Sequence, residues 1–230
     1  MPESTTRRRR FRFSLRTLLI VVVLLSLPMG WFGFKMREAE RQRKAVEAIG
    51  NAGGWVLYDY HRTEGGGMPM RAEPPAPAWL RRLVGVDFFS DVIGAGSVER
   101  GDKALEHVNE LASLNLLHLS GTEVTDAHLE GLKALTRLDW LGLAGTQVTN
   151  AGLEHIKGLT NLECLYLSET RVTDAGLENI KALTKLRHLD LNGTHVTEEG
   201  IEGLRRALPS CEIYWSPHST ADPKTNLEPK

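Results

Sequence analysis

The sequence predicts an α/β solenoid, a right-handed coil with one strand and one helix per turn, preceded by a single transmembrane helix. Three observations lead to this fold class: a segment that recurs every 24 residues, two hydrophobic periodicities within each repeat, and an uncharged run of 18 residues near the N-terminus. A chain of 230 residues is long enough to bury the core that such a coil requires.

The repeat covers residues 111–206 as four consecutive units without an insertion. The second unit, from Leu135, reads LTRLDWLGLAGTQVTNAGLEHIKG, and the third, from Leu159, reads LTNLECLYLSETRVTDAGLENIKA. Self-similarity at a fixed interval of this length indicates one supersecondary unit per repeat, which cannot bury its apolar face alone. The units therefore have to stack.

Two periodicities within a unit assign its secondary structure. Leu141 and Leu143 alternate as in a strand, whereas Leu153, Ile156 and Leu159 recur at helical spacing. Both sets must point inward, so each coil covers the apolar side of its neighbour and the strands line up as a parallel sheet.

Threonines recur just past each predicted strand, and we expect them to form a structural ladder. They are Thr122, Thr146, Thr170 and Thr194. Backbone groups that leave a strand need partners, so the hydroxyls are expected to bond to backbone groups of the turn. The Thr-Asp pairs that follow, such as Thr173 and Asp174, predict N-caps of the helices.

The flanking residues predict degraded coils that cap the stack. Residues 35–110 are interpreted as a juxtamembrane helix followed by irregular N-terminal capping repeats. Their predicted elements are a helix over 36–50, a strand over 55–60, a Gly- and Pro-rich loop over 61–78, a strand over 80–89 and a helix over 101–114. Residues 207–216 predict a C-terminal cap with Ile213 inward, and residues 217–230 a disordered tail.

The N-terminus has the pattern of a membrane anchor. Residues 1–16 form a basic tail with six arginines and one glutamate, and residues 17–34 carry no charge. As a helix the uncharged run is roughly 27 Å long, close to the hydrocarbon thickness of a bilayer. A cleaved signal peptide is the alternative, but small residues in an A-x-A-like arrangement do not follow the run. A retained transmembrane helix is the better interpretation.

Charge predicts the orientation and excludes one class of partner. The basic tail is denser in arginine than the segment after Lys35, so we expect a cytoplasmic N-terminus and an exported repeat domain. The chain has a net charge of −1 and residues 1–16 carry +5, so the remainder sums to −6. A nucleic-acid groove would need basic residues on the folded part, so no nucleic-acid partner is expected.

The four units resemble leucine-rich repeats, whose signature is L-x-x-L-x-L-x-x-N-x-L, here with threonine at the asparagine position. The motif T-x-V-T-D-A-G-L at residues 170–177 is similar to that of bacterial members. With its basic front and apolar segment, the chain resembles a bacterial membrane-anchored leucine-rich-repeat protein. That resemblance implies a non-catalytic scaffold that binds a protein or an envelope polymer. It assigns no functional residue, because the shared positions build the coil.

Candidate binding residues are those that vary between coils and point away from the core along the strands. The proposed partner-binding set is Trp140, Tyr166, His188, Asp190, His118 and Cys164. Stacked columns of such side chains lie about 4.8 Å apart on neighbouring strands. Trp140 and Tyr166 are the best anchors, since exposed aromatic rings with a polar group favour protein interfaces. The alternative is a structural spacer whose strand face binds nothing.

An enzyme is the third interpretation and the least favoured. Cys164, His188 and Asp190 have the residue types of a nucleophilic triad, but an open sheet face supplies neither an oxyanion hole nor a dry pocket. His118, His188 and His195 have no metal-ligand spacing, so no metal or other cofactor is predicted. The chain has two cysteines and lacks the P-loop, H-E-x-x-H and G-x-S-x-G motifs.

Overall fold

The computed structural model describes residues 15–61, 73–97, 105 and 107–217, with side chains from residue 26 onward. The described residues form one seven-stranded sheet whose strands follow chain order. These are β1 Trp55–Tyr58, β2 Val92–Gly96, β3 Leu116–His118, β4 Trp140–Gly142, β5 Cys164–Tyr166, β6 His188–Asp190 and β7 Glu212–Tyr214. Pairs from β2 to β7 are parallel, whereas β1 and β2 are antiparallel.

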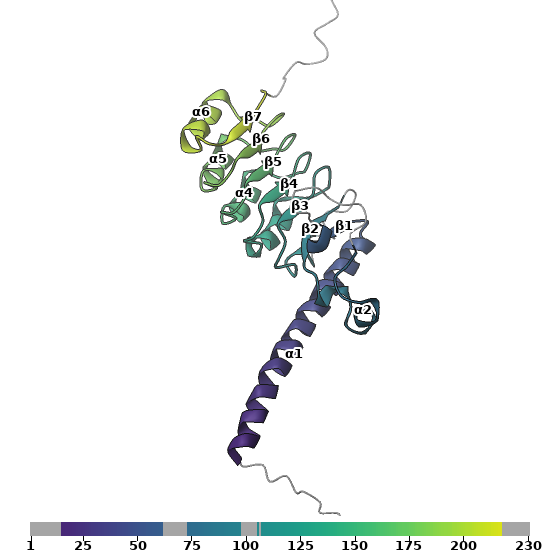
Figure 1. Cartoon of the computed structure of the whole chain (residues 1–230). Helices are drawn as coiled ribbons and strands as arrows, with labels where there is room; N and C mark the ends of the chain where they lie inside the picture. The colour runs from purple at the N-terminus through teal and green to yellow at the C-terminus, as the bar shows by residue number, and fades with distance from the viewer. Residues whose placement is uncertain (1–14, 62–72, 98–104, 106, 218–230) are drawn as a thin grey trace, which may run out of the picture.

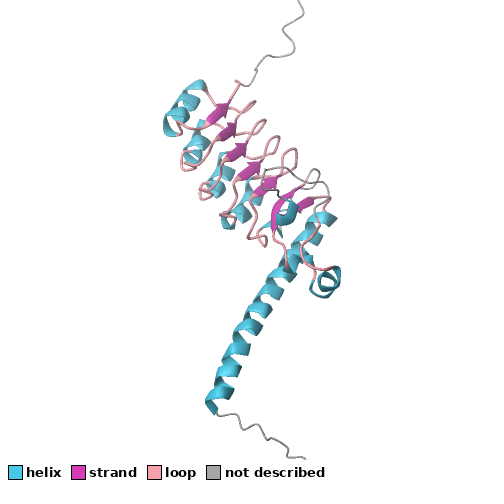
Figure 2. Ribbon diagram, in the orientation of Figure 1, coloured by secondary structure: helices cyan, strands magenta, loops and turns pink. Residues whose placement is uncertain are grey.

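Helices return the chain between successive strands and lie on the side of the coil opposite the sheet (Figure 2). They are η3 Asp126–Ala134, α4 Asn150–Ile156, α5 Asp174–Ile180 and α6 Glu198–Ala207. The predicted α/β architecture of strand and helix repeats is confirmed. The first of these helices is a 3₁₀-helix, in which His128 Nδ1 accepts a hydrogen bond from Thr125 N at 3.0 Å.

The core is a set of stacked columns, one for each inward position of the repeat. In the second unit the inward side chains are all 0 or 1% exposed: Leu135, Leu138, Leu141, Leu143, Val148, Leu153 and Ile156. The residues 24 positions earlier and later are also buried and belong to the same cluster. Burial of this kind contributes about 1.5–3 kcal/mol per large apolar side chain, so stacking of the coils stabilises each one.

The four threonines occupy equivalent places in successive coils, and each is buried. Each hydroxyl donates to the carbonyl oxygen three residues earlier, at 2.6 Å in every case: Leu119, Leu143, Leu167 and Leu191. The hydroxyls thus satisfy the backbone carbonyl at the point where the chain turns out of the strand. The residue before the threonine has a positive φ in each coil. It is Gly121, Gly145 and Gly193 in the first, second and fourth coils, and Glu169, with φ 57°, in the third.

The expected N-caps need a correction. Thr149 and Thr197 do cap their helices, accepting from Ala151 N and Gly200 N at 3.3 and 3.2 Å. The acidic partner of the pair does not cap its own helix. Asp174 Oδ1 and Oδ2 instead accept from the amide and the hydroxyl of Thr197 in the following coil, at 2.8 and 2.7 Å. The sequence predicted that Asp174 would cap the helix that begins beside it, because the two are adjacent in the chain.

Helix α1, Leu15–Asn51, is continuous, so the predicted membrane helix and juxtamembrane helix are parts of one element. It runs away from the β1 end of the sheet (Figure 1). Its last turns close that end of the core with Ala45 and Ile49, both fully buried. Within the described side chains, no helix contains a stretch long and apolar enough to cross a membrane. The predicted transmembrane segment covers residues 17–34, and the side chains of residues 17–25 are not among those described. The transmembrane helix therefore stays a prediction.

The strand predicted over residues 80–89 is wrong. These residues form α2, Ala78–Val84, and the short 3₁₀-helix η2, Val86–Phe88. The strand of this region is β2, in the Gly-rich VIGAG, which the sequence analysis missed. A short apolar run cannot be assigned by periodicity alone, and Pro77 just before α2 favours a helix start.

A buried polar network fastens α2 and η2 to α1. The carboxylate of Asp87 accepts from Gln42 Nε2 at 3.1 Å and from Tyr58 Oη at 3.0 Å. Arg43 Nε lies 3.6 Å from the same carboxylate, and its guanidinium donates to Val84 O at 3.1 Å. Burial and the charge of Asp87 raise the pKa of Tyr58. The network fixes the N-terminal cap to the helix that leads into it.

The remaining predicted elements are partly described. Residues 55–60 give β1 and then the 3₁₀-helix η1, Asp59–His61. Most of the 61–78 loop, residues 101–104 and 106 of the predicted 101–114 helix, and the tail from residue 218 lie outside the described residues. In the described part of 101–114, residues 105, 107 and 108 are helical, whereas residues 109–114 form turns and irregular structure, so the predicted helix is too long. Residues 207–216 contain β7, and Ile213 and Trp215 pack against the last coil, where Trp215 Nε1 donates to Val196 O at 3.1 Å.

Candidate functional site

The open face of the sheet carries the varying side chains in two registered columns. One column contains Gly94, Leu116, Trp140, Cys164, His188 and Glu212. The other contains Gly96, His118, Gly142, Tyr166, Asp190 and Tyr214. Parallel in-register pairing places each member directly beside the next, so residues 24 positions apart in sequence become neighbours on one surface.

Three aromatic side chains of this face stack into one row. The rings of His118 and Trp140 are 5.6 Å apart and nearly parallel, at 13°. Trp140 and Tyr166 are 5.1 Å apart at 39°. Each contact joins the two columns diagonally, and ring pairs at such separations contribute about 0.5–1.5 kcal/mol beyond their buried area. All three side chains are half-buried, so part of each ring remains accessible to solvent. It is a preorganised aromatic surface.

Glycines lie under two indole rings of the face. A Cβ on Gly142 would lie 2.8 Å from Cη2 of Trp140, and a Cβ on Gly96 would lie 2.7 Å from Cζ2 of Trp55. Both distances are far below van der Waals contact, so any other residue would lift the ring. The glycine at position 142 therefore permits Trp140 to lie flat along the sheet. Trp55, on β1, extends the aromatic surface toward the N-terminal end.

The C-terminal end of the face is acidic and polar. Glu212 Oε2 lies 3.2 Å from His188 Nδ1 and accepts from Tyr214 Oη at 3.1 Å. The carboxylate of Asp190 accepts from the amide and the side chain of Asn192 at 3.0 and 2.6 Å. Glu212 and Tyr214 were not among the predicted site residues, because the C-terminal cap no longer follows the repeat.

Cys164 and His188 lie side by side on adjacent strands, but His188 and Asp190 each have other partners. Burial, with the charges of Glu163 and Asp139, raises the pKa of the Cys164 thiol, which disfavours the nucleophilic thiolate. His188 pairs with Glu212, and Asp190 bonds to Asn192. Within the described part of the chain, no hydrogen bond joins Cys164 to either of them.

The histidines considered for metal binding are also apart. His118 stacks on Trp140, His188 pairs with Glu212, and His195 lies past the strand. Among the residues that the structure describes, no group of three or more His, Cys, Asp or Glu side chains is arranged to hold a metal ion.

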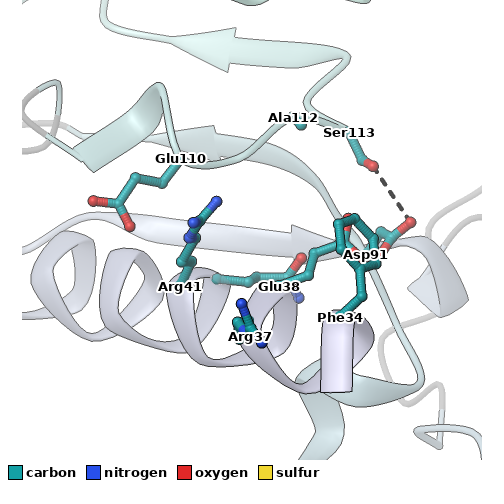
Figure 3. A pocket seen from close by; sticks show the side chains of 9 residues that line it. Phe34, Arg37, Glu38, Arg41, Asp91, Glu110, Ala112 and Ser113 are labelled. Carbon is teal, nitrogen blue, oxygen red and sulfur yellow. Dashed lines mark hydrogen bonds between the residues drawn. The ribbon is translucent and has the colours of Figure 1, made fainter. Parts of the chain in front are cut away.

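A separate cavity of about 320 Å³ lies where α1 meets the first coils (Figure 3). Its lining is Phe34, Arg37, Glu38, Arg41, Gln42, Asp91, Glu110, Ala112 and Ser113. Lys35 Nζ lies 3.0 Å from Glu38 and 3.6 Å from Asp91, and Ser113 Oγ donates to Asp91 at 3.3 Å. The acidic groups are thus partnered, and the cavity contains none of the predicted site residues.

Comparison with known proteins identifies the repeat. Residues 160–205 match the family described as leucine-rich repeats (2 copies). No curated protein matches the chain in sequence.

Similar solved structures include an internalin of Listeria monocytogenes, InlF, with 22% identity and a TM-score of 0.42, over 48% of this chain and 30% of that one. A leucine-rich-repeat protein of Leptospira interrogans is 28% identical, with a TM-score of 0.38, over 46% of this chain and 26% of that one. The repeat ectodomain of the Arabidopsis thaliana receptor kinase SOBIR1 is 13% identical, with a TM-score of 0.47, over 78% and 93%.

The match to this chain covers less than a third of the internalin and of the Leptospira protein. The family match covers two of the four coils, and the other two share their period, register and buried positions. The last two regular coils, over residues 160–205, thus match the leucine-rich-repeat family.

Proposed function

We propose that the chain is a non-catalytic, membrane-anchored leucine-rich-repeat scaffold that binds a protein through the open face of its sheet. Leucine-rich repeats are typical of protein-interaction scaffolds. An envelope polymer is the other partner class that the sequence suggests. A structural spacer without a ligand is the competing function.

One observation carries the binding proposal: the row of His118, Trp140 and Tyr166 on the strand face. Interfaces draw most of their energy from a few aromatic anchors that are rigid before binding. Here the rings are held by stacking and by the glycine beneath Trp140, so little side-chain entropy remains to be lost. The acidic Asp190 and Glu212 at the other end provide a polar rim.

The membrane anchor rests on sequence and on exposure. The uncharged run over residues 17–34 has the length of a bilayer span. In its described part, α1 exposes apolar side chains on all sides: Leu27, Met29, Trp31, Phe32 and Phe34. A helix that is apolar all round belongs in a protein core or in lipid. Trp31 and Phe32 contact Phe88, and Phe34 lines the cavity beside the first coils, but all five side chains remain exposed. The denser basic tail supports a cytoplasmic N-terminus.

The binding proposal is tested by affinity capture of the full chain from its native membranes. The face variant is Trp140→Ala with Tyr166→Ala, and the matched control is Glu154→Ala with Lys157→Ala on the helix side of the same coils. We expect wild type and control to retain at least one common protein that the face variant loses at least tenfold. Thermal unfolding of each variant separates lost binding from lost folding.

Equal recovery of every partner by a folded face variant would favour the spacer. The orientation has its own test, a reporter fused after Lys230 that is active only when exported. Activity of that reporter is the expected result, and an inactive but expressed fusion would reverse the proposed topology.

A further inference from the structure

Helix α2 carries an apolar face that no described part of the protein covers. Trp79 is 67% exposed and Leu83 is 74% exposed, and their spacing of four residues places them on one side of the helix. Val84 is buried on the other side. Single exposed apolar residues are ordinary on a protein surface, but an aromatic and a leucine side by side on a seven-residue helix form a small apolar patch.

The short 3₁₀-helix η2, which follows this patch, contacts the apolar part of α1. Phe88, which follows α2 in η2, contacts Trp31 and Phe32 of α1 with ring centroids 6.3 and 5.3 Å apart. The hydrogen bond from Arg43 to Val84 O joins the last residue of α2 to α1. Figure 1 shows α2 projecting to one side of α1, near the end of the sheet from which α1 emerges. The segment is therefore fixed close to the residues at which the uncharged run ends.

Basic side chains accompany the two apolar surfaces. Arg37 and Arg41 follow the uncharged run on α1, and Arg82 lies next to Leu83 on α2. All three are exposed, and within the described residues none is paired with a carboxylate. Arg37 and Arg41 line the cavity between α1 and the first coils with Glu38 and Asp91, so Arg82 is the one of the three that borders the patch on α2. An aromatic ring and a leucine beside an unpaired arginine suit the interface of an anionic membrane.

We propose that α2 lies on the membrane surface, with Trp79 and Leu83 at the boundary of headgroups and acyl chains and with Arg82 facing anionic headgroups. This inference rests on the proposed membrane anchor. A single helix anchor leaves the attached domain free to rotate and tilt. A second contact through α2, which the Asp87 network joins rigidly to α1, would set the direction in which the strand face points.

The test uses the full chain in vesicles of phosphatidylcholine with phosphatidylglycerol. A nitroxide is attached at Leu83→Cys in a background of Cys164→Ser and Cys211→Ser, and its collisions with oxygen and with a water-soluble nickel chelate are compared by electron paramagnetic resonance. The matched reference is Glu154→Cys, exposed on α4. We expect the label at position 83 to favour oxygen over nickel by several fold, and the label at 154 to favour nickel. Omitting phosphatidylglycerol should reduce the preference at position 83.

Three results would overturn the inference, and they are distinguishable. Retention of the chain after alkaline carbonate extraction, with position 83 as accessible to nickel as position 154, would reject the α2 contact but leave the anchor. Release by carbonate would reject the anchor and the contact together. Dipolar broadening at position 83 that disappears on dilution with unlabelled chain would assign the patch to a second copy of the protein.

Discussion

The carboxylate of Asp126 accepts two hydrogen bonds from Thr149, one from the backbone amide at 2.7 Å and one from the hydroxyl at 2.6 Å, although the two residues belong to successive coils. One coil later, Asn150 Oδ1 accepts from the amide of Thr173 at 2.9 Å, and Asn150 Nδ2 donates to the Thr173 hydroxyl at 2.8 Å. These bonds link neighbouring coils at the start of each helix and explain why an Asp or Asn follows the threonine. In the last helical coil the position is Glu198, and within the described residues no later coil offers a threonine to bind.

A glycine makes room for this inter-coil bond, which leads to the first prediction. A Cβ on Gly176 would lie 2.5 Å from the side-chain oxygen Oδ1 of Asn150 and 2.8 Å from Leu153 Cδ1. We expect Gly176→Ala to lower the free energy of unfolding by about 2 kcal/mol, because the contact strains a packed core and disturbs a part-buried hydrogen bond. Urea denaturation followed by circular dichroism measures the change.

The matched control is Gly203→Ala, in α6, where a Cβ would meet nothing within 4 Å. There the better helix propensity of alanine should raise the free energy of unfolding by about 0.5–1 kcal/mol. If both substitutions stabilised the protein, the glycine would not be needed for the inter-coil bond.

The buried threonine of the turn gives a second prediction. Thr146→Val keeps the shape but removes the bond from Oγ1 to Leu143 O. We expect a loss of about 1–2 kcal/mol in the free energy of unfolding, since a buried carbonyl loses a partner. Thr136→Val, at an exposed position, should change stability by less than about 0.5 kcal/mol. Equal stability of Thr146→Val and wild type would show that the hydroxyl bond contributes nothing.

Glu169 is the third case, because it occupies the left-handed position that glycine fills in the other coils, with φ 57°. A non-glycine residue there costs about 1 kcal/mol. Glu169→Gly is therefore expected to raise the free energy of unfolding by about 0.5–1 kcal/mol, measured by thermal and urea denaturation. Arg171→Gly, two residues later and without a positive φ, should lower it. A destabilised Glu169→Gly variant would assign the glutamate side chain a stabilising contact.

Cys164 gives a prediction in pH. Burial and the charges of Glu163 and Asp139 raise its pKa, so the thiolate forms only above the usual range of about 8.5. In a Cys211→Ser chain, the rate of alkylation by iodoacetamide should therefore stay low at pH 7 and rise at a higher pH than for free cysteine. Cys211 is replaced so that Cys164 is the only thiol in the chain that can be alkylated. In the unmodified chain burial raises the pKa of the Cys211 thiol to about 11, and its alkylation at high pH would overlap with that of Cys164. Half-maximal reactivity at or below pH 8.5 would restore the thiol alternative.

Local pattern predicted the repeated part of the fold well. The period of 24 residues fixes which leucines lie inward, and the structure buries Leu141, Leu143, Leu153 and Ile156 as the spacing indicates. The same period places residues such as Trp140 and Cys164 side by side, because parallel strands in register preserve the repeat. Where the period breaks down, prediction failed: the region before the first unit was assigned a strand at residues 80–89 that is helical.

The candidate site was only half accessible to sequence reasoning. The columns of the strand face follow from the repeat, but the direction of each side chain within a column does not. His188 turns to Glu212 in the C-terminal cap, and Asp190 turns to Asn192, and the repeat could not indicate either partner. Trp55 joins the aromatic surface from β1, which lies outside the repeats and pairs antiparallel.

The sequence by itself determined the coil: its period, its inward residues and the threonines that close each turn, because these depend on interactions that recur identically in every unit. Only the tertiary structure decided the aromatic row, the Asp-to-Thr bonds between coils and the Asp87 network that fastens α1. The inter-coil bonds to threonine recur 23 residues apart, but the period alone does not say which polar groups bond. The aromatic row and the Asp87 network join residues whose spacing does not repeat, so packing alone sets which side chain each ring or polar group meets.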